Sequence, residues 1–230
     1  MKHEKGNALW FILIAISLLA LLTVMLSRGS SNTNETGSYE RNVITANEIF
    51  SFAKSIDNAI NGLMAKGCSE NEISLQADWN NNGTITDTAG DAYNATSPVD
   101  KSCHLFHIAG SGLHFNQDIA GFRFTVSGFH RINALGCNNA SLFCTEIIFA
   151  LKDIPKNICE AINRELNLPI NPILFDTNGA DGFPIITGTF PSAGGTRIGE
   201  ADARLSGEHS ACYLDNDDDV MIFYHVILVR

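Results

Sequence analysis

Oxygen-bearing side chains alternate along the segment that begins at Asp78. Asp78, Asn80 and Asn82 occupy every second position, and Gly83 follows them directly. Calcium-binding loops open in this way, because carboxylate and amide oxygens are the ligands that Ca²⁺ prefers and a glycine permits the sharp turn. The order of residues therefore makes Asp78, Asn80 and Asn82 candidate calcium ligands.

The end of the same segment departs from a complete calcium loop. Its twelfth position, which supplies a bidentate carboxylate in such loops, is Ala89. Asp87 and Asp91 are near enough in sequence to take that role with a different geometry. The alternative is a loop rich in Asn and Gly turns that binds no ion. Calcium is the one cofactor that the sequence suggests, and both interpretations stay open.

Two further clusters contain groups that bind metals in other proteins. An acidic cluster near the C-terminus consists of Asp215, Asp217, Asp218 and Asp219. A cation would relieve the repulsion among these charges, but a solvated turn is the simpler interpretation. The other cluster consists of Cys103, His104 and His107, with His114 nearby. If Cys103 forms a disulfide, this cluster retains only histidines, which are too few to indicate a zinc site.

The sequence lacks the motifs of common enzyme classes. It contains no Gly-x-Ser-x-Gly, His-Glu-x-x-His or Walker-type segment, and no nucleophile with its base can be assembled from it. The formal net charge of -10 opposes binding to nucleic acid, because the phosphates would be repelled. We therefore predict that the protein is not an enzyme and has no nucleic-acid partner.

Six cysteines follow the apolar N-terminal segment, and none lies within it. They are Cys68, Cys103, Cys137, Cys144, Cys159 and Cys212. An even number in one part of a chain is typical of disulfides formed in an oxidising compartment, and buried free thiols are the alternative. No two are spaced as Cys-x-x-Cys, so neither a redox dithiol nor a zinc ribbon is indicated. Proximity in the sequence favours the pairs Cys68–Cys103, Cys137–Cys144 and Cys159–Cys212.

An uncharged apolar segment over residues 8–26 is the strongest feature of the chain. As an α-helix it would be about 28 Å long, close to the hydrocarbon thickness of a bilayer. It is longer than the apolar part of a secretory signal peptide, and no Ala-x-Ala site follows it. We therefore predict a transmembrane helix over residues 7–27 after a leader over residues 1–6. The leader is either retained, which leaves a plain anchor, or removed after a glycine.

Charges on the two sides of this segment predict its orientation. Lys2 and Lys5 precede it, whereas most of the acidic residues follow it. By the positive-inside rule the N-terminus is cytoplasmic and the rest of the chain is exported. We expect a single span of the inner membrane, with the C-terminal domain in the periplasm or outside the cell.

The exported part has the pattern of one α+β domain over residues 44–230, joined to the membrane by a polar tether over residues 28–43. A capping box at Thr45 and apolar residues at helical spacing predict a helix over residues 45–66, with Gly67 as its C-cap. Further elements are a long surface loop over residues 76–102, strands over residues 122–126, 144–151, 210–214 and 220–229, and a short helix from Pro155. The last strand is apolar on both faces, as a central strand is. We expect the first helix to pack on an antiparallel sheet of these strands.

The start of the chain resembles a type IV prepilin or pseudopilin. The matching residues are Lys5 and Gly6, the short charged leader that they end, and the apolar helix that follows. In that family a prepilin peptidase cuts after the glycine, so the resemblance implies cleavage between Gly6 and Asn7. The family's architecture, a helix against an antiparallel sheet in a disulfide-bonded head, is similar to the one expected here.

The resemblance implies a structural role. Pilins usually carry a glutamate five residues into the mature chain, where this chain has Phe11, and some minor, tip-located pseudopilins also lack that glutamate. We therefore predict a membrane-anchored minor pilin or pseudopilin of a type IV pilus or type II secretion filament. Its partners would be other pilin-like subunits and a prepilin peptidase. The alternative is a membrane-anchored periplasmic binding or interaction module that does not polymerise.

A second resemblance covers more of the chain. Residues 6–9, 100–104, 158–163 and 223–226 are similar to segments of a set of uncharacterised bacterial single-span proteins. This likeness implies a shared fold and no particular activity.

Overall fold

The structure is a computed structural model, and it describes most of the chain. The described residues are 7–86, 89–116, 118–136, 145–177, 185–188 and 197–229, with the side chains of residues 7–9, 26–36 and 89 left out. The chain forms two compact units, Met1–Asn42 and Val43–Arg230. The helices are α1 (Asn7–Ala65) and α2 (Lys156–Glu165), with short 3-10 turns at Glu70–Glu72, Ala89–Asp91 and Ala203–Leu205. The strands are β1 (Asp118–Ile119), β2 (Phe122–Ser127), β3 (Arg131–Ile132), β4 (Ile147–Leu151), β5 (Phe175–Asp176), β6 (Arg197–Ile198), β7 (Ser210–Asp215) and β8 (Val220–Leu228).

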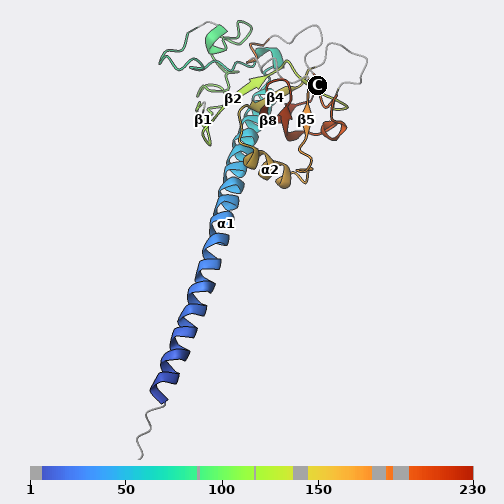
Figure 1. The fold of residues 1–230 in the computed structure, drawn as a ribbon. Coiled ribbons are helices and arrows are strands. Elements are labelled where there is room, and N and C mark those ends of the chain that lie inside the picture. Colours follow the sequence, from blue (N-terminus) through green and yellow to red (C-terminus); the bar gives the residue numbers. More distant parts are fainter. Residues whose placement is uncertain are drawn as a thin grey trace, which may run out of the picture. The chain divides into compact units, whose positions relative to one another are not determined.

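Helix α1 is continuous over 59 residues (Figure 1). The sequence predicts an irregular tether over residues 28–43, and the structure keeps this range helical instead. The range contains no proline, and extending an existing helix costs much less free energy than starting a new one. Thr45 and Glu48, which have the spacing of a capping box, therefore lie inside α1 and not at the beginning of a helix.

The first unit contains the whole segment for which the sequence predicts a membrane span, residues 7–27. Within the described part of the chain, where the side chains of this segment run from Trp10 to Met25, no helix has both the length and the apolar character needed to cross a membrane. The large apolar side chains between these two residues are all exposed, with exposed fractions of 39% to 69%.

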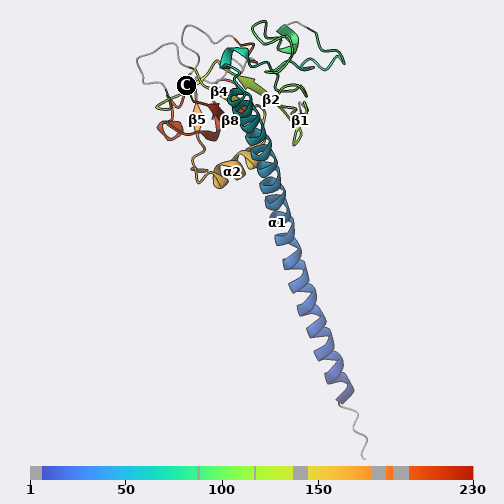
Figure 2. The same cartoon turned by 180° about the vertical axis from the view of Figure 1, so that it is seen from behind.

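In the second unit, the end of α1 packs on one face of the sheet. Its buried side chains recur at three- and four-residue spacing and are Ala46, Ile49, Ala53, Ile56, Ile60 and Leu63. Two aromatic rings beside this stripe contact the sheet. The ring centroid of Phe52 lies 5.0 Å from that of Phe124 in β2. Phe50 lies 5.5 Å from Phe223 of β8. Figure 2 shows this end of the helix in front of the strands. The helical stripe predicted from the sequence is confirmed.

The end of α1 has the predicted glycine C-cap. Gly67 adopts a φ of 102°, a conformation that a glycine reaches without steric cost. The N–H of Cys68 donates to the carbonyl of Leu63 at 3.1 Å, and the N–H of Gly67 donates to the carbonyl of Met64 at 2.9 Å. These bonds satisfy the last carbonyls of the helix and turn the chain back toward the core.

Six strands form one mostly antiparallel sheet in the order β1-β2-β4-β8-β7-β5. All neighbours are antiparallel except β5, which runs parallel to β7. Strand β8 lies in the interior of the sheet, and its apolar residues face two separate layers. Phe223 joins the core under α1, whereas Ile222 and Tyr224 join a second core on the other face, covered in part by Ile132 of β3 and Ile198 of β6. The predicted α+β class, with a helix on an antiparallel sheet, is therefore confirmed.

Two disulfides join distant parts of the second unit. Cys68 pairs with Cys103, and Cys159 of α2 pairs with Cys212 of β7, as the sequence predicts. The predicted pair Cys137–Cys144 lies outside the described residues. On the chain-entropy model, closing the loop between Cys68 and Cys103 stabilises the fold by about 4 kcal/mol.

A single side chain satisfies the backbone at one edge of β7. Asn163 of α2 is fully buried, and its amide donates to the carbonyl of Cys212 at 2.7 Å. Its oxygen accepts the N–H of Cys212 at 2.9 Å. Asn163 thus does what a neighbouring strand would do at this point, because it satisfies both polar groups of one β7 residue.

Replacing Asn163 by alanine should destabilise the protein strongly. The variant leaves the N–H and C=O of Cys212 buried without these partners, which costs about 2–4 kcal/mol. We expect this loss in the free energy of unfolding, measured by denaturant titration of the oxidised protein. Lys156→Ala, on the exposed side of α2, is the matched control and should change stability by less than about 0.5 kcal/mol. Equal stability of Asn163→Ala and wild type would contradict this role.

The stability of the protein should fall in mild acid because of His130. This side chain is fully buried between β2 and β3. Burial, with a smaller effect of the positive charge of Lys152, lowers the pKa of His130 from 6.5 to about 4. Between these pH values the unfolded chain binds a proton that the folded chain does not, so the free energy of unfolding decreases as the pH falls from 6.5 to 4. Above pH 6.5 His130 is neutral in both states and adds no pH dependence.

The expected loss is about 3 kcal/mol across that interval. Unfolding titrations at a series of pH values should show it in wild type and in the exposed control His114→Gln. His130→Gln should lose that part of the pH dependence. An unchanged slope in His130→Gln would show that another group is responsible.

Candidate functional site

The structure brings the three candidate calcium ligands into one turn. The two carboxylate oxygens of Asp78 accept the N–H groups of Asn82 at 2.9 Å and Gly83 at 2.8 Å. The side-chain oxygen of Asn80 accepts the N–H of Asn82 at 3.1 Å, and that of Asn82 accepts the N–H of Thr84 at 2.8 Å. These oxygens therefore stabilise the turn itself, and calcium binding by Asp78, Asn80 and Asn82 stays a prediction.

Asp91 supports this turn from inside the protein. It is fully buried, and one carboxylate oxygen accepts both the N–H of Thr86 at 2.7 Å and the hydroxyl of Thr86 at 2.6 Å. The other oxygen accepts the amide of Asn80 at 3.1 Å. Ala89, at the position of the missing twelfth ligand, lies in the 3-10 turn that also contains Asp91, and Asp87 lies outside the described residues. The loop is thus fixed to the core through Asp91.

The acidic cluster after β7 is only partly a solvated turn. Asp215 is fully buried at the end of β7, and the N–H of Asp217 donates to its carboxylate at 3.1 Å. Burial raises the pKa of Asp215, and repulsion from Asp218 and Asp217 adds to the effect. Asp218 forms an ion pair with Lys152, with 3.5 Å between the ammonium nitrogen and the carboxylate oxygen. The cluster therefore combines one buried carboxyl with an exposed, partly neutralised turn.

The histidine cluster does not assemble into a metal site. Cys103 is in a disulfide, as expected, and the rings of His104 and His107 are 6.2 Å apart between centroids. Among the residues for which the structure gives a placement, no three side chains of the His, Cys, Asp and Glu types come together as a metal-binding group.

A depression near the β1–β2 hairpin collects polar groups from three parts of the chain. We call it the polar pocket, and it is lined by Asp78, Asn80, Asn81, Phe115, Asn116, Asp118 and Arg123. Its volume is about 560 Å³, within the range of small-molecule sites. The guanidinium of Arg123 donates to the carbonyl of Trp79 at 3.2 Å, which fixes the strand side of the pocket to the loop side.

An aromatic cluster lies under the polar pocket. The ring of Phe115 packs 4.9 Å from Trp79 and 5.0 Å from Phe106, between centroids. Trp79 in turn packs 5.3 Å from Phe124 of β2, so the cluster is continuous with the core under α1. These edge-to-face contacts hold the base of the pocket rigidly.

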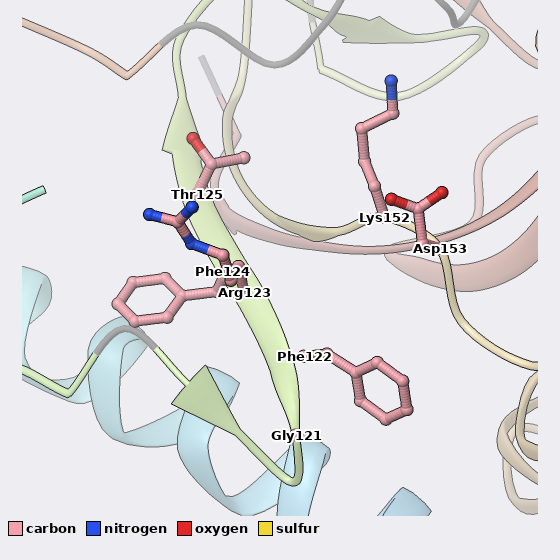
Figure 3. Close-up of a pocket in the computed structure, with 7 residues that line it drawn as sticks. All are labelled: Gly121, Phe122, Arg123, Phe124, Thr125, Lys152 and Asp153. Atoms are coloured by element: carbon pink, nitrogen blue, oxygen red, sulfur yellow. The ribbon is translucent and has the colours of Figure 1, made fainter. Parts of the chain in front are cut away.

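Two more pockets adjoin this region. The first has a volume of about 430 Å³ and is lined by Gln76, Ala77, Asp78, Ile85, Phe106, Ile108, Gly112, Leu113, His114 and Phe115. We call it the apolar pocket after its Ile, Leu and Phe side chains, although Gln76, Asp78 and His114 also line it. The β2 pocket, of about 560 Å³, is drawn in Figure 3 and is lined by Gly121, Phe122, Arg123, Phe124, Thr125, Lys152 and Asp153. Figure 3 shows Lys152 and Asp153 next to each other after β4, across the pocket from Arg123 and Thr125. Arg123 lines both the β2 pocket and the polar pocket.

Sequence reasoning predicts only part of this region. It identifies Asp78, Asn80 and Asn82 by their spacing, but it does not connect them with Asn116, Asp118 and Arg123. No local signal is available for that connection, because it depends on how the loop over residues 76–102 lies against the β1–β2 hairpin. Gly6 lies outside the described residues, and Asn7 is described without its side chain, so cleavage between them stays a prediction.

Asp91→Ala should loosen the loop that forms one side of the polar pocket. Removing its three hydrogen bonds costs about 2 kcal/mol of local stability, which corresponds to about a thirtyfold larger open population. Limited proteolysis, with the cleavage sites located by mass spectrometry, should show faster cutting between residues 78 and 91. Asp100→Ala, in an exposed turn outside the pocket, is the control and should leave the cutting rate there unchanged. An equally protected loop in Asp91→Ala would contradict this role.

No protein-family model, curated protein or solved structure matches this chain. Its function therefore has to be inferred from its own residues and their geometry.

Proposed function

We propose that the protein is a pilin-like, membrane-anchored structural subunit, a minor pilin or pseudopilin of a type IV pilus or type II secretion filament. In this role the apolar part of α1 lies in the inner membrane before assembly and packs with other subunits after it. The second unit is the exported head, in the periplasm or outside the cell.

The observation that carries the proposal is the exposed apolar surface around the first part of α1. Trp10, Phe11, Ile12, Leu13 and Ile14 are consecutive and all exposed. Because successive residues of an α-helix point about 100° apart, this surface surrounds the helix. Apolar area of this extent is stable only when lipid or other apolar protein covers it. The residues on either side extend the apolar segment to residues 8–26 in the sequence.

The architecture of the second unit supports the same proposal. The chain of α1 enters it without a break, and its last five turns pack on an antiparallel sheet. Pilin N-terminal helices usually continue into the head in this way, so the continuous helix strengthens the resemblance based on Lys5, Gly6 and the apolar segment. The two disulfides suit an oxidising compartment outside the cytoplasm.

Phe11 favours a minor component over a major one. The glutamate that pilins usually have at this place pairs with the N-terminal amine of a neighbouring subunit, and an unpaired charge in lipid is costly. Phe11 cannot form that ion pair. A subunit without it suits the tip of a filament, where one neighbour is missing.

The alternative function is a membrane-anchored periplasmic binding or interaction module that does not polymerise. The pockets around Arg123 suit it, because such a module needs a concave site for its ligand. The state of the leader separates the two functions. Removal of the first six residues by a prepilin peptidase indicates a filament subunit, whereas a retained leader indicates a permanent anchor.

Gly6→Leu should block processing of the leader. We expect the wild-type chain, extracted from membranes of cells that contain a prepilin peptidase, to have the intact mass of a chain that begins at Asn7. Gly6→Leu should keep Met1, because a bulky side chain replaces the residue at which the peptidase cuts. Gly37→Ala is the matched control: a methyl group at Gly37 meets no neighbouring atom within 4 Å, and processing should be normal.

An intact leader in the wild-type chain, in cells that process another prepilin correctly, would contradict the filament role. That result would instead indicate the membrane-anchored module that does not polymerise.

A further inference from the structure

The polar pocket has the hydrogen-bonding groups that recognise hydroxyl groups. It presents the carboxylates of Asp78 and Asp118, the amides of three asparagines and the guanidinium of Arg123. A hydroxyl group both donates and accepts a hydrogen bond, so a mixture of acceptors and donors suits it better than donors or acceptors alone. Neighbouring hydroxyl groups on one ring can then bind to an acid and an amide together.

The charges in this pocket oppose anionic ligands. Two carboxylates and one guanidinium leave a local charge of about -1, which opposes phosphates and other anions. The guanidinium of Arg123 in the same wall weakens the attraction of these carboxylates for a metal cation. A neutral, hydroxylated ligand avoids both penalties.

The ring of Phe115 gives this ligand an apolar surface to lie against. Phe115 is half-buried and lines both the polar pocket and the apolar pocket. One side of its environment is the aromatic cluster with Trp79 and Phe106, so the ring is held in place. A sugar ring has this combination of properties, because its C–H groups form an apolar face and its edge carries hydroxyl groups.

The adjoining apolar pocket indicates an apolar substituent on the sugar. Asp78 and Phe115 belong to both pockets, so one ligand can reach both. Ile85 and Ile108 border the apolar pocket, with 61% and 91% of their surface exposed. Large apolar side chains at this exposure are stabilised when a ligand methyl group covers them.

Three of the polar groups are positioned before any ligand arrives. Asp78 is held by two backbone N–H groups, Asn80 by the buried Asp91, and Arg123 by the carbonyl of Trp79. Groups that are already ordered lose less conformational entropy on binding, which raises affinity.

We propose that the polar and apolar pockets together bind a neutral hexose residue that carries a methyl group, such as an N-acetylated or a 6-deoxy sugar. The hydroxyl groups lie toward Asp118 and Asn116, the ring lies on Phe115, and the methyl group lies toward Ile85 and Ile108. This site is independent of whether the chain polymerises, so it stands with either function of the anchored protein.

The test is a titration of the full chain with methyl glycosides, followed by ligand-observed NMR. The chain is purified in dodecylphosphocholine, because glycoside detergents would compete for the site. Methyl N-acetylglucosaminide or methyl fucoside should bind with a Kd of about 1 mM, a value typical of ligands with few atoms. Methyl glucoside has the same methyl group on its anomeric oxygen but no N-acetyl or 6-deoxy methyl group, and it should bind at least about fivefold more weakly.

Two variants and a control locate the site. Asp118→Asn should weaken binding about tenfold, because a charged acceptor is lost while the shape is kept. Ile108→Ser, at an exposed position, should reduce the preference for the N-acetyl or 6-deoxy sugar over the glucoside. Asp153→Asn, in the β2 pocket of Figure 3, should leave the Kd within about twofold of wild type. Thermal unfolding shows whether each variant is folded.

Three results would overturn the proposal. The first is no binding of any of the sugars at about 50 mM, which is far above the expected Kd. The second is equal affinity of wild type and a folded Asp118→Asn. The third is a Ca²⁺ titration in which the ion binds to wild type and not to Asp118→Asn, since the pocket would then be a cation site. None of these results bears on leader cleavage, so failure here is distinct from failure of the filament role.

Discussion

The contact between the last turns of α1 and the sheet is the interaction on which the second unit depends. The stripe that begins at Ala46 and ends at Leu63 covers the apolar face of β2, β4 and β8. The edge strands are too short to form a stable sheet by themselves, and β1 and β5 have two residues each. Burial under the helix therefore stabilises the sheet, and the disulfide from Cys68 joins the end of this helix to the loop that carries Cys103.

Much of this fold can be predicted from local patterns. The apolar stripe of α1, the glycine C-cap, the short helix after Pro155 and the last hairpin all have signals within a few residues, and the structure contains each of them. The helical structure of residues 28–43 could not be predicted in this way, because their polar composition resembles that of a linker. These residues are helical as part of a helix that extends beyond them in both directions. The role of Asn163 also has no local signal, since it becomes clear only when α2 lies beside the edge of β7.

The candidate sites also combine features that have a local signal in the sequence with features that have none. The spacing of Asp78, Asn80 and Asn82 predicts a polar turn, and the structure contains that turn. The long loop over residues 76–102 was expected at the surface, yet Trp79 and Asp91 are buried and fix it to the core. The pocket with Asn116, Asp118 and Arg123 results from this packing. A contact between two segments that are distant in the sequence leaves no periodic pattern there.

The central claim is that the apolar first part of α1 lies in a membrane while a disulfide-bonded head is exported. Alkaline carbonate extraction of cell membranes tests it most directly, because this treatment releases proteins that are only adsorbed and leaves proteins inserted in lipid. We predict that the full chain stays in the membrane pellet, with Cys68 and Cys103 oxidised. A chain that appears in the supernatant with these cysteines reduced would contradict the account.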